Sequence, residues 1–156
     1  MKRNIAVVSI VSLIIDQIIK IICLCFLKST FIIIPNFLSL IFATNDGVAF
    51  SMLSGNKIII ILISILLTFI LIYYIYEDYI KKDKKDSFKE VLYGLLLGGV
   101  LGNLLDRIIH GFVIDYISFN IFGYYFPIFN LADILITVSI IILLIYYFFE
   151  SKMVNK

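Results

Sequence analysis

Histidine, cysteine and net charge are all scarce in this 156-residue chain, and each scarcity argues against a class of function. The single histidine, His110, leaves a zinc site without a plausible ligand set, so we expect no metal and no other cofactor. Cys23 and Cys25 lie two positions apart in an apolar run, where a helix would direct them to different faces, so no disulfide framework is expected. A formal net charge of +2 is too small to indicate a nucleic-acid partner.

Apolar residues are abundant instead. The chain is 62% hydrophobic with a mean hydropathy of +1.10, whereas soluble domains are about 45–50% apolar. Stretches of about 20 apolar residues are long enough to cross a bilayer, and four are present, approximately at residues 5–26, 58–76, 91–109 and 131–149. The sequence therefore predicts an all-α integral membrane protein, a bundle of four transmembrane helices forming one domain over residues 1–156.

The distribution of lysine and arginine predicts the orientation of the bundle. These residues precede the first span, fill the connection at 77–90 and follow the last span, whereas the connection at 110–130 has none. Because basic loops stay in the cytoplasm, we expect both termini and residues 77–90 to be cytoplasmic. The loops at 27–57 and 110–130 would then face outward, carrying Asp115 and Asp133 on that side.

The first outer loop has an unusually apolar composition. Asp46-Gly47 separates an apolar run at 37–42 from another at 48–50, and Asp-Gly between such runs is typical of a hairpin turn. We therefore expect a small β hairpin or sheet on the extracytoplasmic surface of the membrane.

Polar residues follow a glycine stripe in the third span. Gly94, Gly98 and Gly102 recur every four residues, which lets helices approach closely in lipid. The same helix ends in Asp106 and Arg107, which could form an ion pair at the helix end or belong to a functional cluster. In the first span, Asp16 and Lys20 are one turn apart, and we favour a structural ion pair over direct chemistry for them.

Asp115 and Asp133 are the strongest candidates for chemistry. Asp115 lies among apolar residues with no base nearby in sequence, a setting that should raise the pKa of a carboxyl group. Asp133 follows Asn130 by three residues, so it could simply be part of a helix cap. If the two carboxyl groups meet, they could share a proton and activate water without a metal, although an ion or proton site would use similar residues.

Five motifs in order together resemble the lipoprotein signal peptidases (signal peptidase II), which are bacterial membrane aspartic peptidases. They cover most of the chain: Asp16-Gln17-x-x-Lys20, Asn45-x-Gly47-x-Ala49-Phe50, Gly98-Gly99-x-x-Gly102-Asn103-x-x-Asp106-Arg107, Val113-x-Asp115-Tyr116 and Phe129-Asn130-x-Ala132-Asp133. The departures from the family pattern are small. Val48 and Val100 stand where small residues are common, and Tyr116 replaces the usual phenylalanine.

The resemblance implies a role for each motif. Asp115 and Asp133 would be the catalytic pair, with structural support from Asp16, Lys20 and Asp106. Substrate binding or support of the pair would fall to Asn45, Gly47, Asn103, Arg107 and Asn130. The family cleaves prolipoproteins just before a cysteine that carries a diacylglyceryl group, at the outer face of the bacterial cytoplasmic membrane, and is the target of globomycin. We further expect residues 45–50 to hold the lipid-bearing segment over the pair.

Two other functions are compatible with parts of the pattern. A small transporter or ion channel could use the four aspartates as pathway carboxylates, but Asp115 and Asp133 cluster at one face and no inverted repeat is apparent. A non-catalytic membrane scaffold would explain the glycine stripe but would leave Asp115 without a purpose.

Overall fold

The computed structural model describes residues 3–47, 56–80 and 86–154. Within these residues, four helices are long and apolar enough to cross a membrane. They are α1 (Arg3–Phe26), α2 (Lys57–Ile75, continued by a π-helical turn at Tyr76–Ile80), α3 (Ser87–His110) and α4 (Leu131–Val154). The predicted four-helix architecture is confirmed. α3 begins four residues earlier than its predicted span, because Asp86 caps it by accepting from the amides of Phe88 and Lys89.

α3 is the most buried of the four helices, and its glycines explain why. A Cβ atom at Gly98 would lie 1.9 Å from Ser12 Oγ in α1, and one at Gly99 would lie 2.7 Å from the Ala132 carbonyl oxygen in α4. These contacts leave no room for a side chain, so the glycine stripe lets α1 and α4 pack directly on α3. The predicted packing role of the glycines is confirmed.

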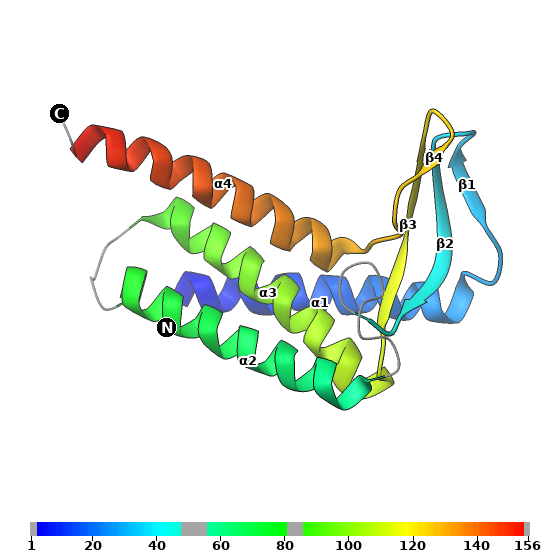
Figure 1. Cartoon of the computed structure of the whole chain (residues 1–156), viewed down its shortest axis with the longest axis horizontal. Helices are drawn as coiled ribbons and strands as arrows, with labels where there is room; N and C mark the ends of the chain where they lie inside the picture. The colour runs from blue at the N-terminus through cyan, green and yellow to red at the C-terminus, as the bar shows by residue number, and fades with distance from the viewer. Residues whose placement is uncertain (1–2, 48–55, 81–85, 155–156) are drawn as a thin grey trace.

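A small antiparallel sheet joins the two connections that were predicted to face outward. Its order is β1 (Phe31–Ile34), β2 (Leu38–Asn45), β3 (Val113–Ile121) and β4 (Tyr124–Tyr125). Figure 1 shows the sheet at one end of the helices, whereas the start of α1 and the end of α4 lie at the other end.

Two features of the sheet differ from the expectation. The described hairpin turns between Ile34 and Leu38, where Asn36 has φ 58°, and β2 ends at Asn45 just before the predicted Asp46-Gly47 turn. The second arm of the predicted hairpin, residues 48–50, lies outside the described residues. The other difference is β3, which forms in a segment interpreted as a loop, because β2 supplies a partner strand from a distant part of the chain.

Candidate active site

Asp115 is placed by β3 at the foot of the sheet. It lies opposite Ala43 of β2, and only 4% of its surface is exposed. Burial and the nearby charge of Asp133 raise the pKa of Asp115, whereas hydrogen bonds with Asn130 and Asn45 lower it. The net result is a rise in the pKa from 3.8 to about 6. The carboxyl group therefore holds its proton to a higher pH than an ordinary aspartate, as its apolar sequence setting predicted.

Asp133 lies in the first turn of α4 and forms the predicted helix cap with Asn130. Its amide donates to Asn130 Oδ1 over 3.0 Å, and its Oδ2 accepts from the Asn130 amide over 3.2 Å. This reciprocal arrangement is a capping box, and it fixes the side chain of Asp133 in one orientation. The other oxygen, Oδ1, accepts from Asn103 Nδ2 over 2.8 Å. The contacts that cap α4 are therefore also contacts that hold Asp133 in the site. A capping role for Asp133 is compatible with a catalytic role.

Asn130 joins the two aspartates directly. The side-chain oxygen Oδ1 and the backbone amide of Asn130 both bind Asp133. The side-chain nitrogen Nδ2 of the same residue donates to Asp115 Oδ1 over 2.6 Å. The same Nδ2 also lies 3.3 Å from Asn103 Oδ1. One buried asparagine therefore binds both carboxyl groups, which come from a strand and a helix separated by a loop.

A buried ion cluster lies behind this pair. Lys20 Nζ is 2.9 Å from Asp16 Oδ2, 2.9 Å from Asp106 Oδ2 and 2.9 Å from Asn103 Oδ1. The side chains of Lys20 and the two aspartates are at most 1% exposed. The predicted Asp16–Lys20 pair is present, and it extends across to α3. Because the lysine also fixes the carboxamide of Asn103, it orients the group that donates to Asp133.

The two carboxylates of the ion cluster also hold the backbone beside the pair. Asp106 Oδ2 accepts from the amide of Ile114 over 3.0 Å, and Asp16 Oδ1 accepts from the amide of Ala132 over 3.0 Å. Each of these amides belongs to the residue that precedes Asp115 or Asp133. This arrangement gives Asp16 and Asp106 matching contacts, one for each candidate catalytic group.

The end of α3 explains how Asp106 comes so close to Asp115. If the helix had continued, Asp106 would have been about 13 Å deeper than Asp115. Instead the helix ends at His110, Gly111 adopts φ 78° and the chain turns back into β3. The expected alternative of an Asp106–Arg107 ion pair is not what the structure shows, because Asp106 pairs with Lys20.

Three predicted site residues remain, Asn45, Gly47 and Arg107, and of these Asn45 contacts Asp115 directly. Arg107 Nη1 donates to the carbonyl of Asn103 over 3.3 Å, and its buried Nε has no hydrogen-bond partner among the described residues. Asn45 ends β2, where its Oδ1 accepts from the amide of Gly47 over 3.1 Å and its side chain also hydrogen-bonds Asp115. The asparagine is thus held in place by the turn that follows it.

Two residues of the site, Gln17 and Tyr116, stand in the sequence motifs but were not among the predicted site residues. Gln17 Nε2 donates to Asp106 Oδ1 over 2.9 Å, which ties α1 to the ion cluster. The hydroxyl of Tyr116, a buried residue, accepts from the amide of Leu131 over 3.1 Å. This amide is at the start of α4, so the tyrosine links the strand of Asp115 to the helix of Asp133. The hydroxyl of Tyr116, which phenylalanine lacks, is the sequence feature that could have indicated this contact.

Comparisons with known proteins agree over nearly the whole chain. The family model described as Signal peptidase (SPase) II matches residues 8–149. A lipoprotein signal peptidase of Staphylococcus haemolyticus (strain JCSC1435) is 38% identical over 141 residues, which cover 89% of this chain and 87% of the relative. A lipoprotein signal peptidase of Staphylococcus aureus (strain JH9) is 38% identical over 140 residues, which cover 88% of this chain and 83% of the relative.

Two solved structures of bacterial membrane enzymes, both obtained by the in meso method, have a similar fold. One matches with a TM-score of 0.84 and 33% identity, and the match covers 97% of this chain and 91% of the solved chain. The other has a TM-score of 0.80 and 34% identity, and the match covers 94% of each chain. The helices and the sheet therefore occur together in related enzymes.

Proposed function

This chain belongs to the signal peptidase II family of lipoprotein signal peptidases, which are aspartic peptidases, and we propose that Asp115 and Asp133 are its catalytic pair. It is a multi-pass bacterial membrane protein that removes signal peptides from prolipoproteins. This family membership favours a peptidase over the transporter, channel and scaffold alternatives. The observation that carries the proposal is the contact of Asn130 with both carboxyl groups.

The two carboxyl groups have different surroundings, which suggests how they divide the work. Asp133 lies at the N-terminus of α4 and accepts hydrogen bonds from Asn103 and from the Asn130 amide, an arrangement that suits a negative charge. Asp115 is more deeply buried, and its pKa of about 6 favours the protonated form. We therefore assign Asp133 as the general base and Asp115 as the general acid.

The reaction then proceeds in two steps. Asp133 accepts a proton from water as the water oxygen attacks the scissile carbonyl carbon, and Asp115 donates its proton to the carbonyl oxygen. In the resulting tetrahedral diol, Asp133 passes its proton to the amide nitrogen as the carbon–nitrogen bond breaks. Asp115 recovers a proton from a hydroxyl of the diol as the carboxylic acid product forms. Both residues end in their starting states, and no covalent intermediate is needed.

The surroundings of the pair suit a lipidated substrate. An apolar pocket of about 360 Å³ adjoins Asp133 and is lined by residues such as Phe129, Ile134 and Val138. We propose that it receives an acyl chain of a diacylglyceryl cysteine, so that the bond just before this cysteine lies at the pair. Arg107 is expected to help bind the substrate, as the family motif implies. Globomycin is expected to compete for the same site.

We also propose that the sheet and the catalytic pair lie on the extracytoplasmic side. The basic connection at 77–90 supports this orientation by the positive-inside rule. The start of α1 and the end of α4 lie at the opposite end from the sheet, as cytoplasmic termini require (Figure 1). A site at the membrane surface could act on a substrate that remains anchored in lipid.

The test compares isosteric variants on a diacylglyceryl-modified prolipoprotein in detergent or lipid. Asp115→Asn and Asp133→Asn should each abolish cleavage while the protein still folds. Asp86→Asn is the matched control, since it removes a carboxylate at the other end of α3 and asparagine also caps helices well. Substantial cleavage by either Asp115→Asn or Asp133→Asn would remove the pair from the mechanism.

A further inference from the structure

The sheet has one edge that the chain itself covers and one that it leaves free. Beyond β3, the segment that follows β4 supplies backbone hydrogen bonds, among them one from the amide of Ile117 to the carbonyl of Phe129 over 2.8 Å. At the other edge lies β1, which pairs with β2, and no described strand pairs with its outer side (Figure 1). The backbone donors and acceptors on that side are therefore open to another chain.

β1 lacks most of the features that usually protect a free edge. All four of its residues, Phe31, Ile32, Ile33 and Ile34, are apolar, exposed and uncharged. Protected edges commonly carry lysine or an inward-pointing charge, or are covered by another segment. The register shift between Ile32 and Ile34 and the following Pro35 end the regular edge, so a segment that pairs with it can be only a few residues long.

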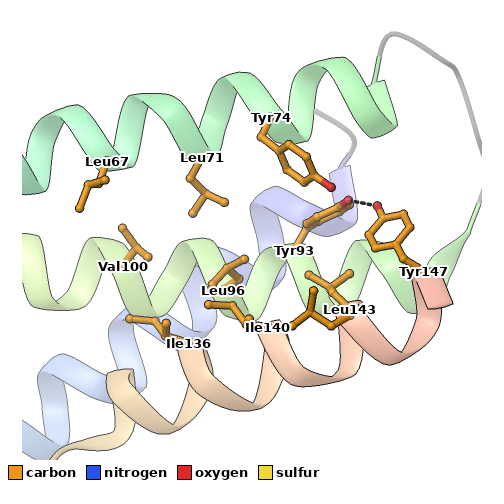
Figure 2. Close-up of a pocket in the computed structure, with 11 residues that line it drawn as sticks. Leu67, Leu71, Tyr74, Tyr93, Leu96, Val100, Ile136, Ile140, Leu143 and Tyr147 are labelled. Carbon is orange, nitrogen blue, oxygen red and sulfur yellow. Dashed lines mark hydrogen bonds between the residues drawn. The ribbon is translucent and has the colours of Figure 1, made fainter.

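Hydrogen-bonding capacity, and not apolar surface alone, identifies the occupant of this edge. A groove of about 330 Å³ between α2, α3 and α4 is lined mainly by apolar side chains, as Figure 2 shows, and lipid acyl chains would suit it. Acyl chains cannot pair with backbone amides and carbonyls, whereas an extended peptide can. A prolipoprotein supplies such a peptide, because its chain continues beyond the cysteine at the cleavage site.

The register of the sheet places the free edge within reach of the catalytic pair. Asp115 and Ile117 lie on one face of β3, because alternate residues of a strand share a face. Ile117 is paired with Leu40 of β2, which is paired with Phe31 of β1, so this face continues to the free edge. Strands are about 4.8 Å apart and residues about 3.4 Å apart along a strand, so a strand added beyond β1 would lie about 16 Å from Asp115. An extended peptide covers this distance in about five residues.

We propose that the free edge of β1 binds a short extended segment of the mature lipoprotein as an added strand, beginning about five residues after the lipidated cysteine. The inference rests on the proposed function, which places that cysteine at the catalytic pair. Main-chain hydrogen bonds supply the affinity, so one edge receives substrates whose mature sequences differ. Attachment to a cysteine already bound at the pair gives the segment a high effective concentration, which a second copy of this chain does not have.

A scan of the substrate backbone tests strand addition without changing the protein. Successive amide groups of a strand point to opposite sides, so only alternate residues of an added strand donate to β1. We compare diacylglyceryl-cysteine peptides in which one N-methylalanine replaces alanine, moved residue by residue from the fourth to the ninth position after the cysteine. Replacement at every second position should lower kcat/KM on the order of tenfold, equivalent to about 1.4 kcal/mol, and replacement at the positions between should not.

A peptide that ends two residues after the cysteine is the reference for the proposed function. The parent protein should cleave it with a kcat/KM on the order of tenfold below that of the longer unmodified peptide. If the two peptides are cleaved equally well, or if N-methylation has no effect or the same effect at every position, the edge does not bind the mature segment. If the parent cleaves none of the peptides, the proposed function fails and the inference falls with it.

Disulfide trapping locates the segment on the sheet. Ile32→Cys on β1 and Tyr124→Cys on β4 place thiols at opposite edges of the sheet, at positions where the parent side chains are 62% and 65% exposed. Both are made in a Cys25→Ser background, since Cys25 is exposed and Cys23 is buried. Asp133→Asn is added to keep the bound peptide uncleaved.

A peptide with a free cysteine near the sixth position should form a disulfide with Ile32→Cys and not with Tyr124→Cys. Paired residues of adjacent strands have Cα atoms about 4.5–5.5 Å apart, which is the separation that a disulfide spans. Adducts of equal yield at both edges, or a homodimer of Ile32→Cys in place of the adduct, would overturn the inference.

Discussion

Asp115→Asn should make the protein more stable at neutral and alkaline pH while abolishing cleavage. The folded protein raises the pKa of Asp115 to about 6, chiefly by burial, and the ordinary value of 3.8 applies after unfolding. Ionised Asp115 therefore destabilises the fold. Above about pH 6, the ionised carboxylate lowers the free energy of unfolding by about 3 kcal/mol. This figure is the pKa difference between 3.8 and about 6 multiplied by about 1.4 kcal/mol for each pKa unit.

The pH dependence separates this effect from other consequences of the substitution. Between pH 3.8 and about 6 the folded protein binds a proton that the unfolded chain has lost, so the parent loses stability as the pH rises through this window. The advantage of Asp115→Asn over the parent should therefore shrink from about 3 kcal/mol at pH 8 to about 1 kcal/mol at pH 4.5. A constant hydrogen-bond difference would not change with pH.

Unfolding by SDS in mixed micelles, followed by far-ultraviolet circular dichroism, measures this difference. Asp86→Asn is a control of opposite sign. Although burial alone would raise the pKa of Asp86, hydrogen bonds from Tyr146 and from the amides of Lys89 and Phe88 lower it. Ionised Asp86 thus stabilises the fold above pH 3.8, and its variant should be less stable than the parent at pH 8. An Asp115→Asn advantage of equal size at pH 8 and pH 4.5 would refute the reasoning.

Three further outcomes are expected. The pH–rate profile for prolipoprotein cleavage should fall as the pH rises through about 6, because Asp115 must hold its proton to act as the acid; a profile that only rises there would reverse the assigned roles. Tyr116→Phe should lower kcat about fivefold with little change in KM. The lost hydrogen bond contributes about 1 kcal/mol, and it orients α4 through the amide of Leu131 and not through the substrate; an increase in KM alone would contradict this. Lys20→Met should destabilise the protein by about 3–5 kcal/mol in SDS unfolding, because two buried carboxylates lose their cation, and a loss below about 1 kcal/mol would argue against the ion cluster.

Contacts within one helix turn could be predicted from the sequence. The Asp16–Lys20 pair follows from a spacing of four residues, and the Asn130–Asp133 cap follows from a spacing of three. Helical geometry fixes the distance between such residues wherever the helix lies, so these predictions needed no knowledge of the fold.

Contacts between distant segments could not be predicted in the same way. β3 had β-branched and aromatic residues suited to a strand, but its pairing partner β2 lies in the other outer connection. The reversal of the chain at Gly111 brings Ile114 to Asp106, and the sequence alone was compatible with a continued helix.

The sequence by itself determined the class of environment, since only a membrane accommodates so many apolar residues in four long runs, and it identified the two aspartates and the family that they resemble. Tertiary structure decided that Asn130 binds both aspartates, that Asp16 and Asp106 hold the amides beside them, and that an apolar groove lies between α2, α3 and α4. The physical reason is that hydropathy and helical spacing are local properties of the chain. Convergence of strand, helix and groove depends instead on how distant segments pack, which no short stretch of sequence specifies.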